Sequence, residues 1–245
     1  MSRSFASTAD VLNSTANPLD TGGDFSVQAW LYPTNPTAGT LQVFLCLGRD
    51  SNNGGVSFDI NASGNWDVIL NGVQTFDSGV AATANAWSHF VITYVHSNIT
   101  MTLYINGSQV YQHFPAFATI TAGQTVVGAQ LNSSSSGYTR GFLGRIAQVG
   151  LWNTALTSGN VSTLYGGTVG GETVASANVQ GFWRLCGVAS PEPDVSSNNN
   201  ALTVTGTSSA ADPPGITTGC TTACVLPARY AREEHSIWTW TSCNP

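Results

Sequence analysis

The feature that most limits what this chain can fold into is the alternation of apolar and polar residues along short segments. In residues 25–31 every second side chain is apolar, whereas Ser26, Gln28 and Trp30 occupy the positions between them. The same alternation recurs in residues 90–94 and 99–105. Successive side chains of a β-strand point to opposite faces, so each segment is predicted to be a strand with one face on a core. Residues 41–47 form a further predicted strand, with one face made by Leu41, Val43, Leu45 and Leu47.

Two Asn-Gly pairs, Asn71-Gly72 and Asn106-Gly107, predict tight turns between neighbouring strands. Asn and Gly adopt the positive φ angles of a type I′ turn, whose twist matches that of the strands it joins. Hairpins that follow one another along a chain favour an antiparallel sandwich of two sheets. The chain also holds 26 Gly and 10 Pro among short β-branched and aromatic runs, which argues against a helical bundle.

One short helix is predicted. Thr157 is suited to cap its first turn, and Val161, Leu164 and Tyr165 have the spacing of a helical face. The pair Gly166-Gly167 is predicted to end it.

The chain changes character at Pro213-Pro214-Gly215, because neither proline nitrogen can donate to a strand ladder. We therefore predict a domain over residues 1–212 and an irregular C-terminal extension over residues 213–245.

Charged residues make up only 8% of the chain, the formal net charge is −6, and all seven basic residues are arginine. This balance disfavours a nucleic-acid partner that is bound through its phosphates. No apolar run approaches the roughly 18 residues that span a bilayer, so no membrane insertion is expected. The first residues, Met1 to Ser7, contain no apolar stretch, so we expect no classical signal peptide.

Four segments, in order, resemble the laminin-G-like, concanavalin A-like jelly rolls. They are FSVQAWLYP at 25–33, WSHFVITY at 87–94 followed by LYING at 103–107, GFLGRIAQVGLWNTAL at 141–156, and a closing strand at 179–185 followed by Asp194 and residues 196–200. The resemblance covers roughly residues 1–210, and the extension matches no known pattern. It implies an all-β jelly-roll sandwich of two antiparallel sheets whose first and last strands pair. Members of this superfamily bind glycans, proteins or calcium, and some relatives hydrolyse polysaccharides.

Calcium is doubtful for this chain. Where the family pattern has an acidic pair, the chain has Ala147 and Gln148, so a cation would lose hard oxygen ligands. Asp59 and Asp67 are a weaker metal candidate, because they would lie opposite each other if the loop between their strands is symmetric. Solvent between the two carboxylates is the alternative, and a one-residue slip in register would separate them. No cofactor is therefore expected.

No catalytic residue is predicted. Glycoside hydrolysis needs two suitably spaced carboxylates, and none of the four glutamates lies in a strand beside an alternating acidic partner. Trp66 adjoins a polar loop and is the predicted ligand contact, together with Asp59 and Asp67. The other tryptophans of the family segments, including Trp30 and Trp87, are expected to pack in the core.

The extension carries its own candidates. Cys220, Cys224 and Cys243 are disulfide candidates, with Cys243 expected to pair with one of the other two. Trp238 and Trp240 alternate, so in an extended segment both rings face one way and need a cover. A strap over the same domain, a neighbouring protein chain and a sugar are the three alternatives for that cover.

Three classes of function stay open. The first is a non-catalytic structural or recognition protein displayed on a larger assembly, such as a bacteriophage virion decoration, fibre or adaptor protein. The second is a free glycan-binding module, and the third is an enzyme. The first is preferred because a lectin-like chain of low charge with candidate disulfides fits an exposed setting, on a virion or an extracellular surface, yet shows no export signal. Its partners would be other protein chains of a particle or of a homo-oligomer, and surface glycans.

Overall fold

The computed structural model describes residues 1–19, 22–48, 55–70, 74–114, 123–132, 137–187, 189–216 and 220. The predicted turn at Asn71-Gly72 lies outside the described residues, as do Cys224, Cys243, Trp238 and Trp240.

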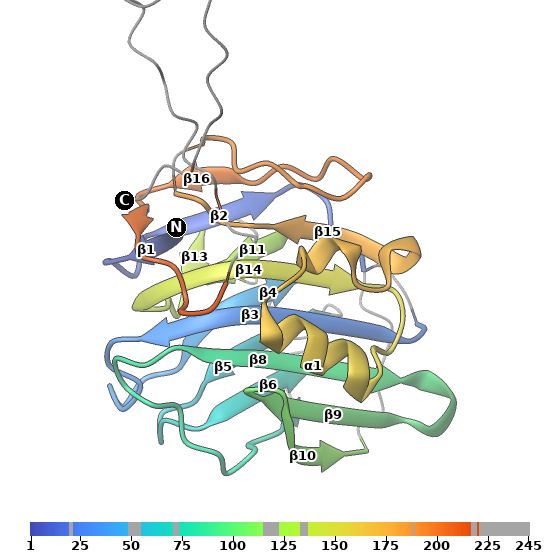
Figure 1. The fold of residues 1–245 in the computed structure, drawn as a ribbon. Helices are drawn as coiled ribbons and strands as arrows, with labels where there is room; N and C mark the ends of the chain where they lie inside the picture. The colour runs from blue at the N-terminus through green and yellow to red at the C-terminus, as the bar shows by residue number, and fades with distance from the viewer. Residues whose placement is uncertain are drawn as a thin grey trace, which may run out of the picture.

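Within the described residues the chain forms a sandwich of two antiparallel sheets, with one helix on an outer face (Figure 1). Sheet A has the order β10-β9-β8-β3-β14-β1-β17, and β15 also pairs with β14. Its strands are β1 (Ser2–Phe5), β3 (Phe25–Pro33), β8 (Ser88–Val95), β9 (Thr100–Ile105), β10 (Ser108–His113), β14 (Gly144–Trp152), β15 (Val179–Trp183) and β17 (Ser208–Ala210).

Sheet B has the order β16-β2-β11-β4-β5-β6-β7. Its strands are β2 (Val11–Ser14), β4 (Gln42–Leu47), β5 (Val56–Ile60), β6 (Trp66–Leu70), β7 (Gln74–Thr75), β11 (Thr125–Val127) and β16 (Thr203–Thr205). A separate ribbon pairs β12 (Gln130–Leu131) with β13 (Tyr138–Thr139). The remaining elements are α1 (Ser158–Gly166) and the 3-10 turns η1 (His96–Asn98), η2 (Gly171–Thr173) and η3 (Ser176–Asn178).

An aromatic core fills the space between the sheets. Phe44 and Trp66 of sheet B meet Phe90 of sheet A, with ring centroids 5.0 Å and 5.7 Å from the Phe90 ring. Edge-to-face and tilted contacts of this kind add roughly 0.5–1.5 kcal/mol per pair to the burial of the rings. The two sheets are therefore joined by side chains that the alternating pattern places on their inner faces.

The predicted strands at 25–31, 90–94 and 99–105 are confirmed as β3, β8 and β9. The predicted face of the strand at 41–47 is wrong in part. Leu45 and Leu47 enter the core between the sheets, but Val43 belongs to a cluster on the outer face of sheet B. A register shift between Val43 and Leu45 explains the difference, because one extra residue reverses the alternation of side chains.

The predicted turn and helix are also confirmed. Asn106 and Gly107 have φ angles of 52° and 77° between β9 and β10. Thr157 caps α1, since its side chain accepts a hydrogen bond from the amide of Asn160. Gly167 ends the helix in the left-handed region, with φ of 63°. Val161 and Leu164 are buried against sheet A, so the helix is fixed by one narrow apolar face.

The first and last described strands lie side by side, as the resemblance implied. Ser2 and Ser4 of β1 pair with Ala210 and Ser208 of β17. The boundary near residue 212 stays a prediction. No helix within the described residues has the length and apolar character needed to cross a membrane.

Candidate functional site

A cleft lies on the outer face of sheet A, at the C-terminal end of α1. It has a cavity volume of about 330 Å³ and is lined by Trp30, Trp87, Asn106, Tyr165 and Pro214. We call it the aromatic cleft. Its lining residues come from β3, the segment before β8, the β9–β10 turn, α1 and the segment after β17. The fold therefore assembles the cleft from five separate parts of the sequence.

Three rings pack together at the cleft. Trp30 on β3 lies directly across from His89 on β8, and their ring centroids are 4.9 Å apart. The ring of Tyr165 stacks on both, at 5.8 Å from Trp30 and 5.9 Å from His89. Trp30 is only 4% exposed, whereas Tyr165 is 43% exposed. Tyr165 is therefore the ring that solvent and a ligand meet first.

The buried side of this cluster is polar. His89 Nε2 lies 3.0 Å from Gln28 Oε1, and Gln28 Nε2 donates to the carbonyl of Gln148 at 3.1 Å. Because the Gln28 oxygen accepts, His89 carries its proton on Nε2. Burial lowers the pKa of His89 to about 3, so the imidazole is neutral at physiological pH.

Two polar atoms of the cluster lack a hydrogen-bond partner among the described residues. They are Trp30 Nε1, a donor, and His89 Nδ1, which is an acceptor in the tautomer set by Gln28. A buried donor or acceptor without a partner costs roughly 1–3 kcal/mol. Trp30 also lines the cleft, but its indole nitrogen is itself buried, so a ligand in the cleft as it stands does not reach this N–H.

The turn at Asn106-Gly107 forms one wall. Asn106 Oδ1 accepts from the amide of His89 at 2.8 Å, and the Asn106 amide donates to the carbonyl of His89 at 2.9 Å. A Cβ atom on Gly107 would lie 3.0 Å from Tyr165 Cδ1, so the turn packs closely against this ring. The wall is thus held by backbone and side-chain bonds to the strand that carries His89.

A further aromatic side chain, Tyr32, packs against Trp87 beside the cleft. The Trp87 and Tyr32 rings meet edge to face at 5.5 Å. The guanidinium of Arg145, on the neighbouring strand, lies 4.7 Å above the Tyr32 ring. Tyr32, Trp87 and Arg145 are each half-buried, so these three side chains are packed against their neighbours and also contribute to the protein surface.

The acidic pair lies on the other sheet, and its predicted register is confirmed. Asp59 and Asp67 face each other across β5 and β6, and both are buried. Burial and the neighbouring Asp67 carboxylate raise the pKa of Asp59 well above its usual value. Burial also raises the pKa of Asp67, to about 6. Within the described residues no group of three His, Cys, Asp or Glu side chains is arranged to hold a metal ion.

The family is decided by the sequence of residues 6–162, which match the model of the concanavalin A-like lectin/glucanases superfamily. The chain belongs to this superfamily. No curated protein matches the chain in sequence.

Solved structures of other members of the concanavalin A-like fold are similar to this chain. A candidate carbohydrate-binding protein from Bacteroides ovatus has a TM-score of 0.67 at 16% identity, over 88% of this chain. This chain covers 61% of the length of that protein. The native heptameric SAP-like pentraxin from Limulus polyphemus has a TM-score of 0.60 at 16% identity, over 92% of this chain and 97% of the pentraxin.

A third similar structure is the CBM40 module of the Ruminococcus gnavus IT-sialidase, bound to α2,3 sialyllactose. Its TM-score is 0.52 at 13% identity, and the match covers 66% of this chain and 95% of the module. At these identities the similarities establish the lectin-like fold.

The predicted ligand contact at Trp66 is wrong. Its side chain is fully buried and packs against Phe44 and Phe90 between the sheets of the lectin-like sandwich. Trp66 begins β6, and the alternation of that strand points its first residue inward. Asp59 and Asp67 lie together as predicted, but they are buried on the outer face of sheet B, so neither faces the aromatic cleft on sheet A.

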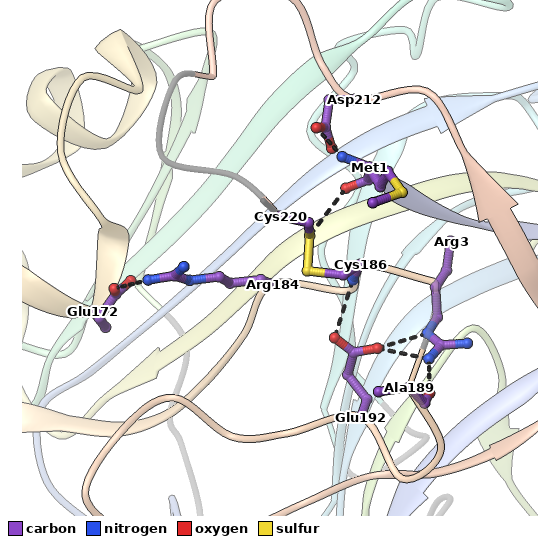
Figure 2. Close-up of a disulfide and its surroundings, with 9 residues drawn as sticks. All are labelled: Met1, Arg3, Glu172, Arg184, Cys186, Ala189, Glu192, Asp212 and Cys220. Carbon is purple, nitrogen blue, oxygen red and sulfur yellow. Dashed lines mark hydrogen bonds and ion pairs between the residues drawn. A yellow bond between two sulfur atoms is a disulfide. The ribbon is translucent and has the colours of Figure 1, made fainter. Parts of the chain in front are cut away.

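One disulfide candidate has a partner that the sequence did not suggest. Cys220 pairs with Cys186, which follows β15, and not with Cys243 (Figure 2). The short sequence spacing of three cysteines favours pairing within the extension, whereas β1, β17 and β15 bring Cys186 close to Cys220 in space. Ala147 and Gln148, where the superfamily has an acidic pair, are buried in β14.

Sequence reasoning missed the residues of the aromatic cleft. Trp30 and Trp87 were expected in the core, and Tyr165 was expected on the apolar face of the helix. One signal could have found Trp30. It alternates with core residues and shares the polar face of its strand with Ser26 and Gln28.

Proposed function

We propose that this chain is a non-catalytic, lectin-like recognition domain that binds a glycan in the aromatic cleft. The observation that carries the proposal is the combination of three aromatic side chains with the polar side chain of Asn106 in one cleft. Ligand sites are typically apolar hollows with a few fixed polar groups, and sugars present both apolar ring faces and hydroxyl groups. Membership of a superfamily rich in glycan binders supports the same choice.

The residues that line the cleft would make different kinds of contact with a glycan. Tyr165 offers a ring face on which a sugar can stack. Trp30 and Trp87 add apolar surface, and the side-chain amide of Asn106 offers a donor to a ring or hydroxyl oxygen. The neutral His89 ring packs against the Trp30 ring from the buried side and so helps to fix its orientation. The neighbouring Trp87–Tyr32 pair extends the aromatic surface, so the cleft suits an oligosaccharide better than a single sugar.

The non-catalytic assignment rests on the described lining. Glycoside hydrolysis needs two carboxyl groups on either side of the scissile bond, about 5–9 Å apart. The described residues that line the cleft include neither Asp nor Glu. The two buried aspartates that face each other belong to the other sheet.

Binding to an immobilised panel of neutral and acidic oligosaccharides tests the proposal. Tyr165→Ala should lower the affinity for the bound glycan about three- to tenfold, because one aromatic contact contributes roughly 0.5–1.5 kcal/mol. Phe114→Ala is the matched control, since Phe114 is a 66% exposed ring that does not line the cleft. The proposal fails if no oligosaccharide binds, or if both variants bind as the parent does.

Display on a larger assembly, such as a bacteriophage virion, is the second candidate and concerns the extension. Its support is in the sequence, where Trp238 and Trp240 alternate in a segment with Cys224 and Cys243. A variant that stops after Cys220 keeps the described part of the chain. Loss of this variant from the native particle, with unchanged melting, would support display. Retention in the particle would contradict it.

A further inference from the structure

The residues after β17 form one wall of the aromatic cleft. We call Ala211–Ile216 together with Cys220 the strap. Figure 1 shows its first part, in orange-red after β17, crossing the face of sheet A toward the end of α1. Pro214 lines the cleft. A Cβ atom on Gly167 would lie 2.7 Å from Ile216 Cδ1 and 3.1 Å from the carbonyl oxygen of Gly215. The strap therefore packs on the end of the helix that carries Tyr165.

One end of the strap is held by the N-terminal strand. Ser2 Oγ donates to the carbonyl of Ala211 at 2.7 Å, and the amino group of Met1 forms an ion pair with Asp212. These contacts continue the pairing of β1 with β17. They fix the strap just before Pro213 and Pro214.

The other end is held by the disulfide between Cys186 and Cys220 (Figure 2). Cys186 is a fixed point of the domain, because its amide donates to Glu192 Oε1 at 3.0 Å. Glu192 Oε2 in turn accepts two bonds from the guanidinium of Arg3, at 2.9 Å and 2.7 Å. This ion pair is almost completely buried. The covalent bond therefore joins the strap to a rigid part of the sandwich.

We propose that the Cys186–Cys220 disulfide holds the strap against the aromatic cleft, so that glycan binding depends on the oxidation state of this bond. The inference rests on the proposed function of the cleft. Both cysteines are partly exposed, so a thiol reductant can reach the bond. Two thiol groups of the reductant supply two electrons and two protons, which give two cysteine thiols and one disulfide of the reductant.

Reduction removes one of the two anchors of the strap. Pro214 then loses its fixed position, and Tyr165 loses the packing of Ile216 on the helix end. A wall that must be ordered again on each binding event lowers affinity, because the ligand has to offset the lost conformational entropy. The cleft is thus complete in an oxidising setting and open on one side in a reducing one.

Hydrogen exchange of the full chain tests the anchor without any ligand. Cys186→Ser/Cys220→Ser, and the parent in dithiothreitol, should exchange at least about tenfold faster at the amides of Gly215, Ile216 and residues 163–167. Strands β3 and β8 should be unchanged, which shows that the sandwich stays folded. Cys46→Ser is the control, because Cys46 is buried in sheet B. Equal exchange in the oxidised and reduced parent would overturn the proposal.

Affinity for the oligosaccharide that binds the parent tests the coupling. The double variant should bind it at least about tenfold more weakly, and dithiothreitol should weaken the parent but leave the variant unchanged. Unchanged affinity in the reduced parent would refute the coupling while leaving the proposed function intact. If no oligosaccharide binds the parent, the proposed function fails, whereas the exchange experiment still decides whether the disulfide anchors the strap. If the double variant does not fold, the comparison of the oxidised and reduced parent decides the coupling, and Ile216→Ala shows separately whether a looser strap weakens binding.

Discussion

Asp59 and Asp67 oppose each other on the outer face of sheet B, where both are buried, and the positive charge of Arg140 offsets only part of the cost at Asp59. Ser57 Oγ donates to Asp59 Oδ2 at 3.2 Å, and the amide of Val68 donates to Asp67 Oδ1 at 2.8 Å. The second oxygen of each carboxyl group has no hydrogen-bond partner among the described residues. Like charges placed directly opposite in a sheet repel, and burial adds a desolvation cost. Each carboxyl therefore holds its proton more tightly in the folded state than in the unfolded chain.

The sign of the pH dependence follows from the raised pKa values. The pKa of Asp67 rises from 3.8 to about 6 on folding, and that of Asp59 rises as well. Between about pH 4 and pH 6 the folded protein binds more protons than the unfolded chain, so the free energy of unfolding falls as pH rises. Well above pH 6 the full cost of the Asp67 charge is present.

Asp59→Asn should therefore stabilise the protein at pH 8 and flatten this dependence. The gain is expected because the substitution removes one of two opposed carboxylates whose burial opposes ionisation. Urea unfolding at pH 5 and pH 8 measures it, and the gain at pH 5 should be smaller. A variant that is less stable than the parent at pH 8 would contradict this prediction.

At the scale of elements, the cap of α1 contributes to the position of Tyr165. Thr157→Ala should lower the free energy of unfolding by about 1 kcal/mol, because the amide of Asn160 loses its acceptor. Thr163→Ala is a matched control, as its hydroxyl bonds to the Gly159 carbonyl within the same exposed helix surface. That change should be close to neutral, since such bonds contribute little to helix stability. Chemical denaturation of the two variants compares them, and equal losses would contradict a specific role of the cap.

The alternating pattern was enough to predict β3, β8 and β9, and the residues at the turn and cap predicted where strands and helix end. These features depend on neighbours within a few positions. The bulge in β4 could not be predicted, because a single inserted residue leaves no repeating signal. The bulge belongs to the pairing of β4 with β5, which lies outside β4 in the sequence.

The cleft was harder to predict than the strands for the same reason. Pro214, Tyr165 and Trp30 come from segments far apart in the chain, and nothing local relates them. The pairing of Cys186 with Cys220 likewise depends on the closing of the sandwich. Only the position of Trp30 on the polar face of its strand carried a local signal.

At the scale of the whole molecule, calcium should add little stability. A ligand that binds only the folded state raises its stability by about 2.7 kcal/mol at a hundredfold excess over Kd. Ala147 and Gln148 offer no carboxylate where the superfamily has one. Thermal melting in millimolar calcium and in a chelator should therefore differ by less than about 2 °C. A rise of about 5 °C or more in calcium would show that the protein has a calcium site and would contradict this prediction.

The place of β1 between β14 and β17 has a consequence for how the protein is made. Ser2 and Ala211 touch although they are 209 residues apart, so β1 is synthesised before both of the strands that flank it, β14 and β17. At about 5–20 residues per second, β1 waits roughly ten seconds or longer with its backbone edges and Phe5 uncovered. During that interval, nascent copies on one messenger can pair with each other, so a holding chaperone at the exit tunnel would raise the yield of folded protein.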